Sequence, residues 1–554
     1  MKDGFVRCAS ATVDIKVADT DYNTSNIIKA IEDAAQNDIK LIVFPELCIT
    51  GYTCGDLFLQ KILIDSAKDS LIKIAKATEN LDITAVVGLP YVAEQTLYNC
   101  AAVVNGGHIK GLVPKLNIPN YAEFYEVRHF TAGKNEVTYV NINGEEIPFG
   151  ANILFKTDAC EDFVLAVEIC EDVWTAMPPS VNHALAGATI IANLSASNEV
   201  IAKDEYREML VKSQSAKLYC GYIYSDAGYG ESTTDLVFAG DNMIAENGTI
   251  LARSKRFNNE CVYTELDLER LVGERKKSNT YNIVGSEKYV SVKLDMNIGD
   301  TKITRYVDKQ PFVPSNDKKR EKRSEEILSI QSLGLKKRLD HTHAKTAVVG
   351  VSGGLDSTLA LLVTVRAFDS LNLDRKNIIA VTMPCFGTTD RTYNNAVNFA
   401  NSLGVTLKEV NIKAAVNQHF ADIEHDPNVY DVTYENSQAR ERTQILMDVA
   451  NKSGGLVIGT GDMSELALGW ATYNGDHMSM YGVNAGVPKT LIRYLVDYEA
   501  KRTNNDILKK TLQDILDTPV SPELLPPKDG KISQKTEHIV GPYELHDFFL
   551  YHLM

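Results

Sequence analysis

The sequence predicts an α/β protein of more than one domain, with a doubly wound parallel sheet in its second half. Short runs of branched apolar residues alternate with helical stretches along the 554 residues, which is the pattern of strand–helix–strand connections. A glycine-rich turn at 350–358 separates a predicted strand from a predicted helix. Up to about residue 270 no stretch has the composition of a linker, so the first half is expected to form one α/β unit.

Composition and charge argue against several classes of protein. The length predicts about two to four domains, and 44% hydrophobic with 23% charged residues is typical of a globular protein. The formal net charge of −16 argues against a generic nucleic-acid binder. No apolar run is long enough to span a membrane, and the N-terminus lacks an apolar signal region. The nine cysteines are scattered without a C-x-x-C pair, which argues against a disulfide framework or a zinc cluster and favours the cytoplasm.

Three reactive side chains of the first half directly follow predicted strands. The strands are 41–44 before Glu46, the hairpin strands 98–104 and 108–113 before Lys115, and 163–167 before Cys170. Taken alone, each side chain has an ordinary structural explanation, such as a solvated charge or a small core thiol. A sharp strand-to-helix turn at Cys170 would instead place helix N–H groups beside the sulfur, which lowers the pKa of a thiol and forms an oxyanion hole. The remaining predictions are a helix at 26–37 and strands at 84–89, 188–194, 216–225, 237–245, 249–253 and 262–266.

The sequence contexts of these three residues together resemble the nitrilase superfamily, whose catalytic set is Glu, Lys and Cys. They read Phe-Pro-Glu-Leu, Pro-Lys-Leu and Glu-Ile-Cys-Glu-Asp-Val-Trp, and the resemblance covers residues 1 to 270. It implies a four-layer αββα sandwich that cleaves a non-peptide C–N bond. In that chemistry Cys170 attacks an amide carbonyl to form a thioester, and Glu46 takes the thiol proton and later activates water. Lys115 stabilises the oxyanion with a backbone N–H, and Glu126 matches an additional glutamate of the superfamily.

Residues 276–323 change in composition and are expected to form an exposed connector. They contain two prolines within 311–314 and a basic run at 318–323. So short a basic run in an acidic protein is expected to be a solvated face and not a nucleic-acid site. The predicted domains are therefore 1–275 and 324–554.

The second half alternates strands with helices around the turn 350–358. A helix is predicted first, at 324–339, and its apolar face carries Ile327, Ile330 and Leu333. Strands are predicted at 346–349, 378–383, 407–412 and 455–458, and further helices from 359, at 391–403 and from 435. This alternation implies a parallel, doubly wound sheet, in which ligands bind at the C-terminal ends of the strands.

The turn 350–358, Gly-Val-Ser-Gly-Gly-Leu-Asp-Ser-Thr, has the features of an anion site without the ending of a Walker A loop. Free N–H groups at a helix N-terminus favour an anion, and adjacent glycines allow close approach. Asp356 indicates that a cation accompanies the anion, as magnesium accompanies phosphate. Thr460 and Glu465 follow the strand 455–458, so both are expected beside the turn, with Glu465 as the second magnesium ligand. The aromatic residues within 470–473 offer faces for a flat ring.

The Ser-Gly-Gly-Leu-Asp-Ser stretch resembles the PP-loop of the ATP pyrophosphatases, which adenylate a carboxyl or carbonyl group and release pyrophosphate. The accompanying motifs resemble NAD synthetases, and they lie at 459–460, 464–470, 483–490, 518–524, 534–537 and 541–544. With its nitrilase-like half, nearly the whole chain resembles the glutamine-dependent NAD synthetase family. The second domain is then expected to have the adenine nucleotide alpha hydrolase-like fold.

The resemblance implies two coupled reactions, both at positions that match the family's motifs. The first domain would hydrolyse glutamine, and the second would use ATP and Mg²⁺ to adenylate deamido-NAD, which ammonia then converts to NAD. The catalytic residues would be Glu46, Lys115 and Cys170, and the glutamine-binding residues Tyr52, Tyr121, Glu126, Glu171, Ser197 and Lys203. The ATP-binding residues would be Gly350, Val351, Ser352, Gly353, Gly354, Leu355, Asp356, Ser357 and Thr460. Deamido-NAD would contact Asn436, Arg440, Glu465, Trp470, Ala471, Thr472, Tyr473 and Asp476, and the metal ligands would be Asp356 and Glu465.

The resemblance also implies an internal passage for ammonia and a homo-oligomer, an octamer, without nucleic-acid or membrane partners. Long members of the family continue well beyond the block 541–549, with a basic substrate-contacting residue there, whereas this sequence ends at Met554.

Three alternatives to this function remain. Another PP-loop enzyme, such as a GMP or asparagine synthetase, would carry a different glutaminase domain. An enzyme fed only by free ammonia would have a decayed front half, and a nucleotide-binding scaffold would bind ATP without turnover.

Overall fold

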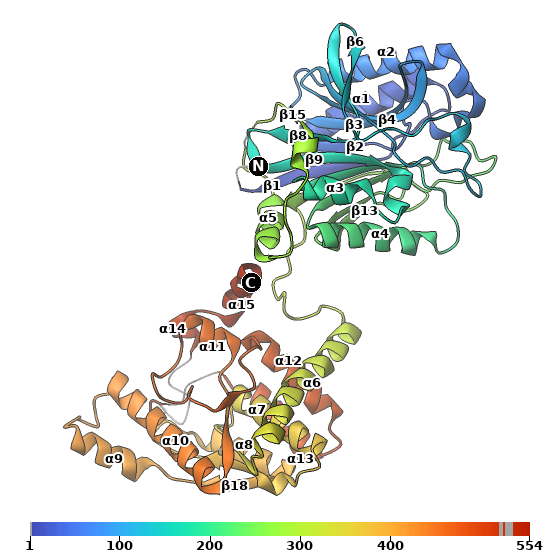
Figure 1. Ribbon diagram of the computed structural model, residues 1–554. Coiled ribbons are helices and arrows are strands. Elements are labelled where there is room, and N and C mark those ends of the chain that lie inside the picture. Colours follow the sequence, from blue (N-terminus) through green and yellow to red (C-terminus); the bar gives the residue numbers. More distant parts are fainter. Residues whose placement is uncertain (1–2, 298, 520–523, 527–535) are drawn as a thin grey trace. The chain divides into compact units, whose positions relative to one another are not determined.

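The computed structural model describes residues 3–297, 299–519, 524–526 and 536–554, which form two compact units, Met1–Tyr306 and Val307–Met554 (Figure 1). Parts of the predicted motifs 518–524 and 534–537 lie outside the described residues. No helix in the described part of the chain is both long and apolar enough to cross a membrane.

The first unit contains two mixed sheets. The first sheet has eight strands, which are in spatial order β14 (Cys261–Asp267), β1 (Phe5–Ala11), β2 (Leu41–Val43), β3 (Thr84–Ala93), β4 (Thr96–Asn105), β5 (His108–Pro114), β7 (Glu145–Phe149) and β6 (Thr138–Ile142). The second has seven, which are β13 (Thr249–Arg253), β12 (Met243–Glu246), β11 (Gly221–Asp226), β10 (Ile190–Ser195), β9 (Cys160–Ile169), β8 (Ile153–Thr157) and β15 (Val290–Lys293). The helices are α1 (Thr20–Gln36), α2 (Lys61–Ala77), α3 (Pro179–Leu185), α4 (Lys203–Leu218) and α5 (Leu268–Lys277).

Three hydrophobic cores separate four layers in this unit (Figure 1). Helices α1 and α2 cover the outer face of the first sheet, where Ile27 and Leu71 pack against strand residues. The inner faces of the two sheets pack on each other through residues such as Val43 and Leu165. Helices α3 and α4 cover the outer face of the second sheet, where Val211 belongs to the core. The predicted αββα sandwich is therefore confirmed.

Two of the strands predicted in the first unit begin later than the sequence suggested. Residues 216–218 are the last turn of α4, which ends at Tyr219 in a left-handed conformation (φ 45°), and β11 begins at Gly221. Residues 237–242 are irregular, and only Met243–Glu246 pairs as β12. Both segments contain apolar residues that are buried outside a strand, Leu218 and Cys220 in the first and Phe238 and Ala239 in the second, so hydrophobicity alone placed the boundaries wrongly.

The second unit has one sheet of five strands, all parallel, in the order β18 (Thr406–Glu409), β17 (Ile378–Thr382), β16 (Thr346–Gly350), β19 (Gly455–Gly459) and β20 (Tyr481–Gly482). Its helices are α6 (Asp317–Thr342), α7 (Leu355–Ser370), α8 (Asp390–Leu403), α9 (Lys413–Asp422), α10 (Val432–Ser453), α11 (Met463–Leu468), α12 (Lys489–Arg502), α13 (Asp506–Leu516), α14 (Glu537–Val540) and α15 (Tyr543–Leu553). One face of the sheet packs on α7, α8 and α12, and the other on α9 and α10. This arrangement confirms the doubly wound parallel sheet.

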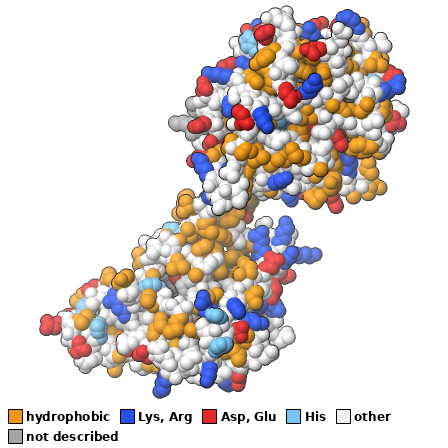
Figure 2. All heavy atoms as spheres, viewed as in Figure 1, with side chains coloured by type: hydrophobic (Ala, Val, Ile, Leu, Met, Phe, Trp, Pro, Cys, Tyr) orange, Lys and Arg blue, Asp and Glu red, His pale blue; other side chains and the backbone are white. Residues whose placement is uncertain are grey.

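The start of the second unit differs from the sequence prediction. Helix α6 begins at Asp317, so the basic run 318–323 forms its first turns, and Figure 2 shows Lys and Arg side chains gathered there. Strand β15 lies within the predicted connector 276–323 and pairs with β8 of the first unit. The apolar face predicted for 324–339 is wrong in part, because Ile330 and Leu333 are exposed. The buried residues of α6 are Ser324, Leu328, Leu335 and Leu339.

Candidate functional site

Glu46 lies just after β2, in a tight segment that a glycine on the neighbouring strand makes possible. A Cβ atom on Gly88 would come within 2.3 Å of the Leu47 backbone nitrogen, so only glycine fits there. The Glu46 side chain is 1% exposed, and Asn99 Nδ2 donates to its Oε1 at 2.6 Å. Its Oε2 is buried and makes no hydrogen bond within the described residues. One oxygen of this carboxylate is therefore held, and the other is available as a proton acceptor.

Lys115 follows β5 and joins two carboxylates in the interior. Its ammonium donates to Glu46 Oε1 at 2.7 Å and to both oxygens of Glu126 at 2.8 and 2.9 Å. The Tyr52 hydroxyl adds a hydrogen bond to Glu126 Oε1 at 2.8 Å. Because Lys115 is only 1% exposed, these carboxylates replace the water it gives up. The cation is thus fixed beside the free oxygen of Glu46.

Cys170 lies at a sharp turn between β9 and a short 3-10 helix, η3 (Cys170–Trp174). Its φ of 44° is in the left-handed region, a strained conformation for a residue with a side chain. Asp172 stabilises the turn, because its carboxylate accepts from the Ile169 N–H at 3.0 Å and from the Asn117 N–H and side-chain amide at 2.9 and 2.7 Å. The backbone of Ala196 acts to lower the pKa of the thiol. The turn therefore has the geometry expected of a nucleophile.

The electrostatics of these three residues favour a neutral thiol with a base beside it. Burial, and then the negative charge of Glu46, raise the pKa of Cys170 well above its usual value, while Lys115 opposes them. Burial also raises the pKa of Glu46 to about 7, against the charge of Lys115. The pKa of Lys115 is raised by Glu126 and Glu46 despite burial, which on its own would lower it. At neutral pH the cation persists, and Glu46 can exchange a proton.

The other residues predicted for glutamine surround these three. Tyr121 donates to both oxygens of Glu171, at 3.0 and 2.9 Å. Lys203, at the start of α4, lies over the rings of Phe124 and Trp174 at 5.5 and 5.3 Å. Burial lowers the pKa of Lys203, and the nearby Cys170 opposes this. The buried Ser197 follows β10.

In the second unit, the turn 350–358 connects β16 to α7 as predicted. Gly353 has a φ of 82°, and a Cβ atom there would come within 2.2 Å of the Thr392 carbonyl oxygen. Ser352 and Ser357 hydroxyls lie 3.2 Å apart, and Thr358 Oγ1 donates to Gly354 O at 2.8 Å. The turn therefore presents hydroxyls at the N-terminus of a helix of sixteen residues, which favours an anion.

Three carboxylates meet beside this turn. Asp356, Asp462 and Glu465 each offer an oxygen within 4.8 Å of the others. Lys489, which is 4% exposed, contacts them at 2.8, 2.6 and 2.8 Å. Burial and the charge of Asp356 raise the pKa of Glu465 to about 8, and Lys489 opposes them. Asp356 Oδ1 is buried without a hydrogen bond among the described residues, so the group retains oxygen ligands for a cation.

Asn484 connects the two segments that carry the three carboxylates. Its Nδ2 donates to the backbone oxygens of Asp356 and Thr460 at 2.9 and 3.0 Å. Because Asn484 is fully buried, the bonds hold Thr460 and Glu465 next to the glycine-rich turn, where the sequence placed them.

The residues predicted for deamido-NAD lie along α10 and the segment after α11. Arg440 Nε donates to Tyr473 O at 3.1 Å, and the Trp470 N–H donates to Glu465 O at 2.9 Å. Asn436 and Thr472 are half-buried, whereas Ala471, Tyr473 and Asp476 are exposed. The segment and α10 are thus joined, but the exposed side chains make no enclosed site by themselves.

Asp547 of the last helix holds the elements that carry Lys489 and Glu465. Its buried carboxylate accepts from the Thr490 N–H at 2.9 Å, from Thr490 Oγ1 at 2.6 Å and from the Ser464 hydroxyl. The Ser464 hydroxyl in turn accepts from the Lys489 N–H at 2.9 Å. Helix α15 thereby stabilises the first turns of α11 and α12.

Asp547→Asn is expected to lower the free energy of unfolding of the second unit by about 1–3 kcal/mol, because an amide has one acceptor oxygen where the carboxylate has two. Urea denaturation followed by circular dichroism measures the change. Glu544→Gln, on the exposed side of the same helix, is the matched control and should leave the midpoint unchanged. Equal midpoints for the two variants would contradict the role of Asp547.

Several residues of the two sites were not singled out from the sequence. Asn99 lies within a strand, and Asn484 and Asp547 act through contacts with distant parts of the chain, so no local pattern marked them. Asp172, Asp462 and Lys489 do lie inside motifs that the sequence made conspicuous. The available signals were the spacing of Asp172 from Cys170, the spacing of Asp462 from Glu465, and a lysine at the start of a helix within 483–490.

Comparisons with known proteins show which families the two parts of the chain resemble. The carbon–nitrogen hydrolase family model matches residues 7–276, and the NAD synthase family model matches residues 327–525. Over 567 aligned positions the chain is 40% identical to the glutamine-dependent NAD(+) synthetase of Mycobacterium tuberculosis, covering 100% of this chain and 83% of the relative. The corresponding protein of Aquifex aeolicus is 30% identical, covering 98% of this chain and 88% of its own length. A glutamine-dependent NAD(+) synthetase structure from Cytophaga hutchinsonii has a TM-score of 0.43 at 25% identity, covering 93% of this chain and 84% of that one.

Proposed function

Because the chain belongs to the glutamine-dependent NAD(+) synthetase family, we propose that it makes NAD from deamido-NAD and ATP with ammonia released from glutamine at Cys170. The contact of Lys115 with Glu46, beside the strained turn of Cys170, is the observation that carries the glutaminase assignment. As a member of the family it is a ligase that forms a C–N bond. Steady-state NAD formation with glutamine or ammonia as the donor tests the whole assignment.

In the first reaction, Cys170 attacks the side-chain carbonyl of glutamine and passes its proton to the free Oε2 of Glu46. Lys115 and a backbone N–H at the turn stabilise the negative oxygen of the tetrahedral intermediate. Glu46 then gives this proton to the amide nitrogen, and collapse of the intermediate releases ammonia and leaves a thioester. Glu46 then activates a water molecule, which hydrolyses the thioester to glutamate and restores the thiol.

Tyr52, Tyr121, Glu126, Glu171, Ser197 and Lys203 are proposed to position glutamine. Lys203 is a desolvated cation close to Cys170, which suits the α-carboxylate of the substrate. Glu171 is a half-buried acid beside Tyr121, which suits the α-ammonium group. The charges of the substrate are thus matched by charges of opposite sign.

In the second reaction, the residues 350–358 and Thr460 are proposed to hold the phosphates of ATP. Asp356 and Glu465 would hold Mg²⁺, and Asp462 lies close enough to join them. When bound, the metal ion supplies positive charge to the phosphate groups. Lys489 already lies among these carboxylates, so its ammonium is in place to neutralise phosphate as well. The nicotinate carboxylate attacks the α-phosphate and becomes adenylated, pyrophosphate leaves, and ammonia then displaces AMP.

The residues proposed to contact deamido-NAD are Asn436, Arg440, Trp470–Tyr473 and Asp476.

We also propose that ammonia passes between the sites without mixing with bulk water, which would convert it to ammonium. With ¹⁵N-amide glutamine and excess unlabelled ammonium, NAD should keep most of the ¹⁵N label. Full dilution of the label would contradict channelling.

Glutamine hydrolysis is expected to fall about tenfold between pH 8 and pH 6, because Glu46 must be unprotonated to accept the thiol proton and its pKa lies at about 7. The kcat/KM for glutamate release, measured from pH 6 to 8.5, tests this. The far-UV circular dichroism spectrum over the same pH range is the control and should not change. A flat glutaminase profile would remove Glu46 from the role of general base.

A further inference from the structure

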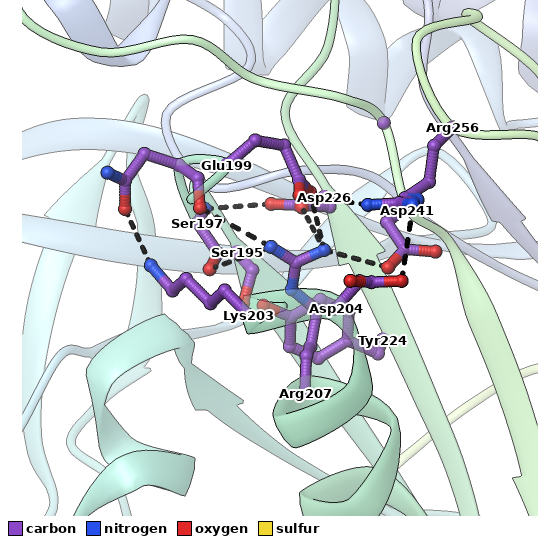
Figure 3. Close-up of polar contacts among 12 residues, drawn as sticks. Ser195, Ser197, Glu199, Lys203, Asp204, Arg207, Tyr224, Asp226, Asp241 and Arg256 are labelled. Carbon is purple, nitrogen blue, oxygen red and sulfur yellow. Dashed lines mark hydrogen bonds and ion pairs between the residues drawn. The ribbon is translucent and has the colours of Figure 1, made fainter. Parts of the chain in front are cut away.

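A buried arginine lies beneath the segment 195–199, which connects β10 to the loop before α4. Arg207, on α4, is 1% exposed. Its Nη1 donates to Glu199 Oε1 and to Asp241 Oδ2, both at 2.7 Å (Figure 3). Asp226, at the end of β11, brings a third buried carboxylate, with Oδ2 3.8 Å from the same nitrogen. The guanidinium is therefore fixed by acids from three separate parts of the chain.

The same network holds the backbone of the segment. Arg207 Nη2 donates to Ser197 Oγ and to the Asn198 carbonyl oxygen, both at 3.4 Å. Asp226 Oδ1 accepts from the Ser197 N–H at 2.8 Å. Figure 3 shows dashed lines that join Ser197 to both Arg207 and Asp226. Two consecutive residues are thus held by one arginine and one aspartate.

This segment adjoins the glutaminase site. The Ala196 backbone acts on the pKa of the Cys170 thiol, in the direction opposite to burial. Ser197 is one of the proposed glutamine-binding residues, and Asn198 Oδ1 accepts from Lys203 Nζ at 2.5 Å. A shift of the segment would therefore move Ser197 and Lys203 relative to Cys170.

The geometry requires an arginine and not merely a positive charge. A guanidinium has two Nη groups in one plane, so one reaches the carboxylates while the other reaches the segment. A lysine ammonium is a single point and cannot serve both sets of acceptors at these distances. Burying an arginine with three acids costs desolvation energy, so tight packing by itself does not explain the network.

We propose that Arg207 is a positioning residue for glutamine, which places Ser197 and Lys203 for the α-amino-acid end of the substrate without touching it. Arg207 has this role only if Ser197 and Lys203 bind glutamine, as proposed above. Its effect should therefore appear in the affinity for glutamine and in neither the ammonia-dependent reaction nor the use of ATP.

Arg207→Lys should raise the KM for glutamine about tenfold, the factor that corresponds to about 1.4 kcal/mol, and change kcat by less than about threefold. Arg253→Lys is the matched control: Arg253 also binds Asp241, at 2.8 and 2.9 Å, but has no contact with residues 195–199 in the described structure. It should keep the parent KM. In both variants, ammonia-dependent NAD formation should equal that of the parent chain.

Glu199→Gln provides a second variant in case Arg207→Lys does not fold, because it weakens one ion pair of Arg207 and keeps the guanidinium. It should raise the KM for glutamine about threefold. An unchanged KM in the folded Arg207→Lys variant overturns the inference, as does an equal rise in Arg253→Lys. If Arg207→Lys is unfolded, an unchanged KM in Glu199→Gln overturns it. Loss of the proposed function is a different result, namely glutamine use that survives in Cys170→Ala.

Discussion

Cys170→Ala is expected to abolish NAD formation from glutamine and to leave NAD formation from ammonia intact. The thiol is the proposed nucleophile of the first reaction and interacts with Glu46 and Lys115, so the glutamine-dependent rate should fall by at least about 10⁴-fold. The second reaction uses residues of the other unit, which the substitution does not alter. The measurement is steady-state NAD formation by the full chain at saturating glutamine or ammonium.

Cys220→Ala is the matched control, because Cys220 is also a buried thiol of the first unit but lies in the core beside α4. It should retain both activities, apart from some loss of stability. Equal loss of glutamine and ammonia use in Cys170→Ala would contradict the assignment of two separate sites. Retained glutamine use would remove Cys170 from the mechanism.

Asp356→Asn is expected to lower NAD formation from both donors by at least about 100-fold. The amide cannot supply the negative charge that a magnesium ligand needs, and it also leaves the buried Lys489 with one carboxylate fewer. Glutamate release by Cys170 is measured on the same preparation, and its persistence shows that the first unit is folded.

Asp340→Asn, on the exposed surface of α6, serves as the matched control for the loss of one negative charge in the same unit and should keep full activity. A second readout is the thermal midpoint with and without MgATP. The parent chain should be stabilised by MgATP, and Asp356→Asn should lose most of that shift. Near-normal NAD formation by Asp356→Asn would exclude it from the metal site.

Much of the fold follows from local sequence because strands and turns here are marked by neighbouring residues. The turn Asn105–Gly106–Gly107 predicted the hairpin of β4 and β5, in which Asn105 pairs with His108. The apolar face of α6 was predicted wrongly because packing, and not local sequence, decides which of its residues are buried. Ile330 and Leu333 match a helical period, but the buried face is set by what α7 and α12 offer, and that face runs through Leu328, Leu335 and Leu339.

In each candidate site, likewise, the sequence marks some residues and not the residues that hold them in place. Glu46, Lys115 and Cys170 stand out because each follows a strand, and the packing of the two sheets on each other brings the ends of β2, β5 and β9 together. The residues that hold them do not stand out. Asn99 reaches Glu46 across 53 positions, and Lys489 reaches Asp356 across 133. Such contacts depend on tertiary packing, which no short motif encodes.

The burial of Cys170 beside Glu46 also bears on how the thiol reacts with oxidants. Peroxide and other electrophiles react with thiolates, and exposure as well as ionisation controls that reaction. Cys170 is 6% exposed, and its pKa is raised by burial and by Glu46. A buried thiol of raised pKa is mostly protonated at neutral pH, so we expect Cys170 to react slowly with peroxide while no substrate is bound.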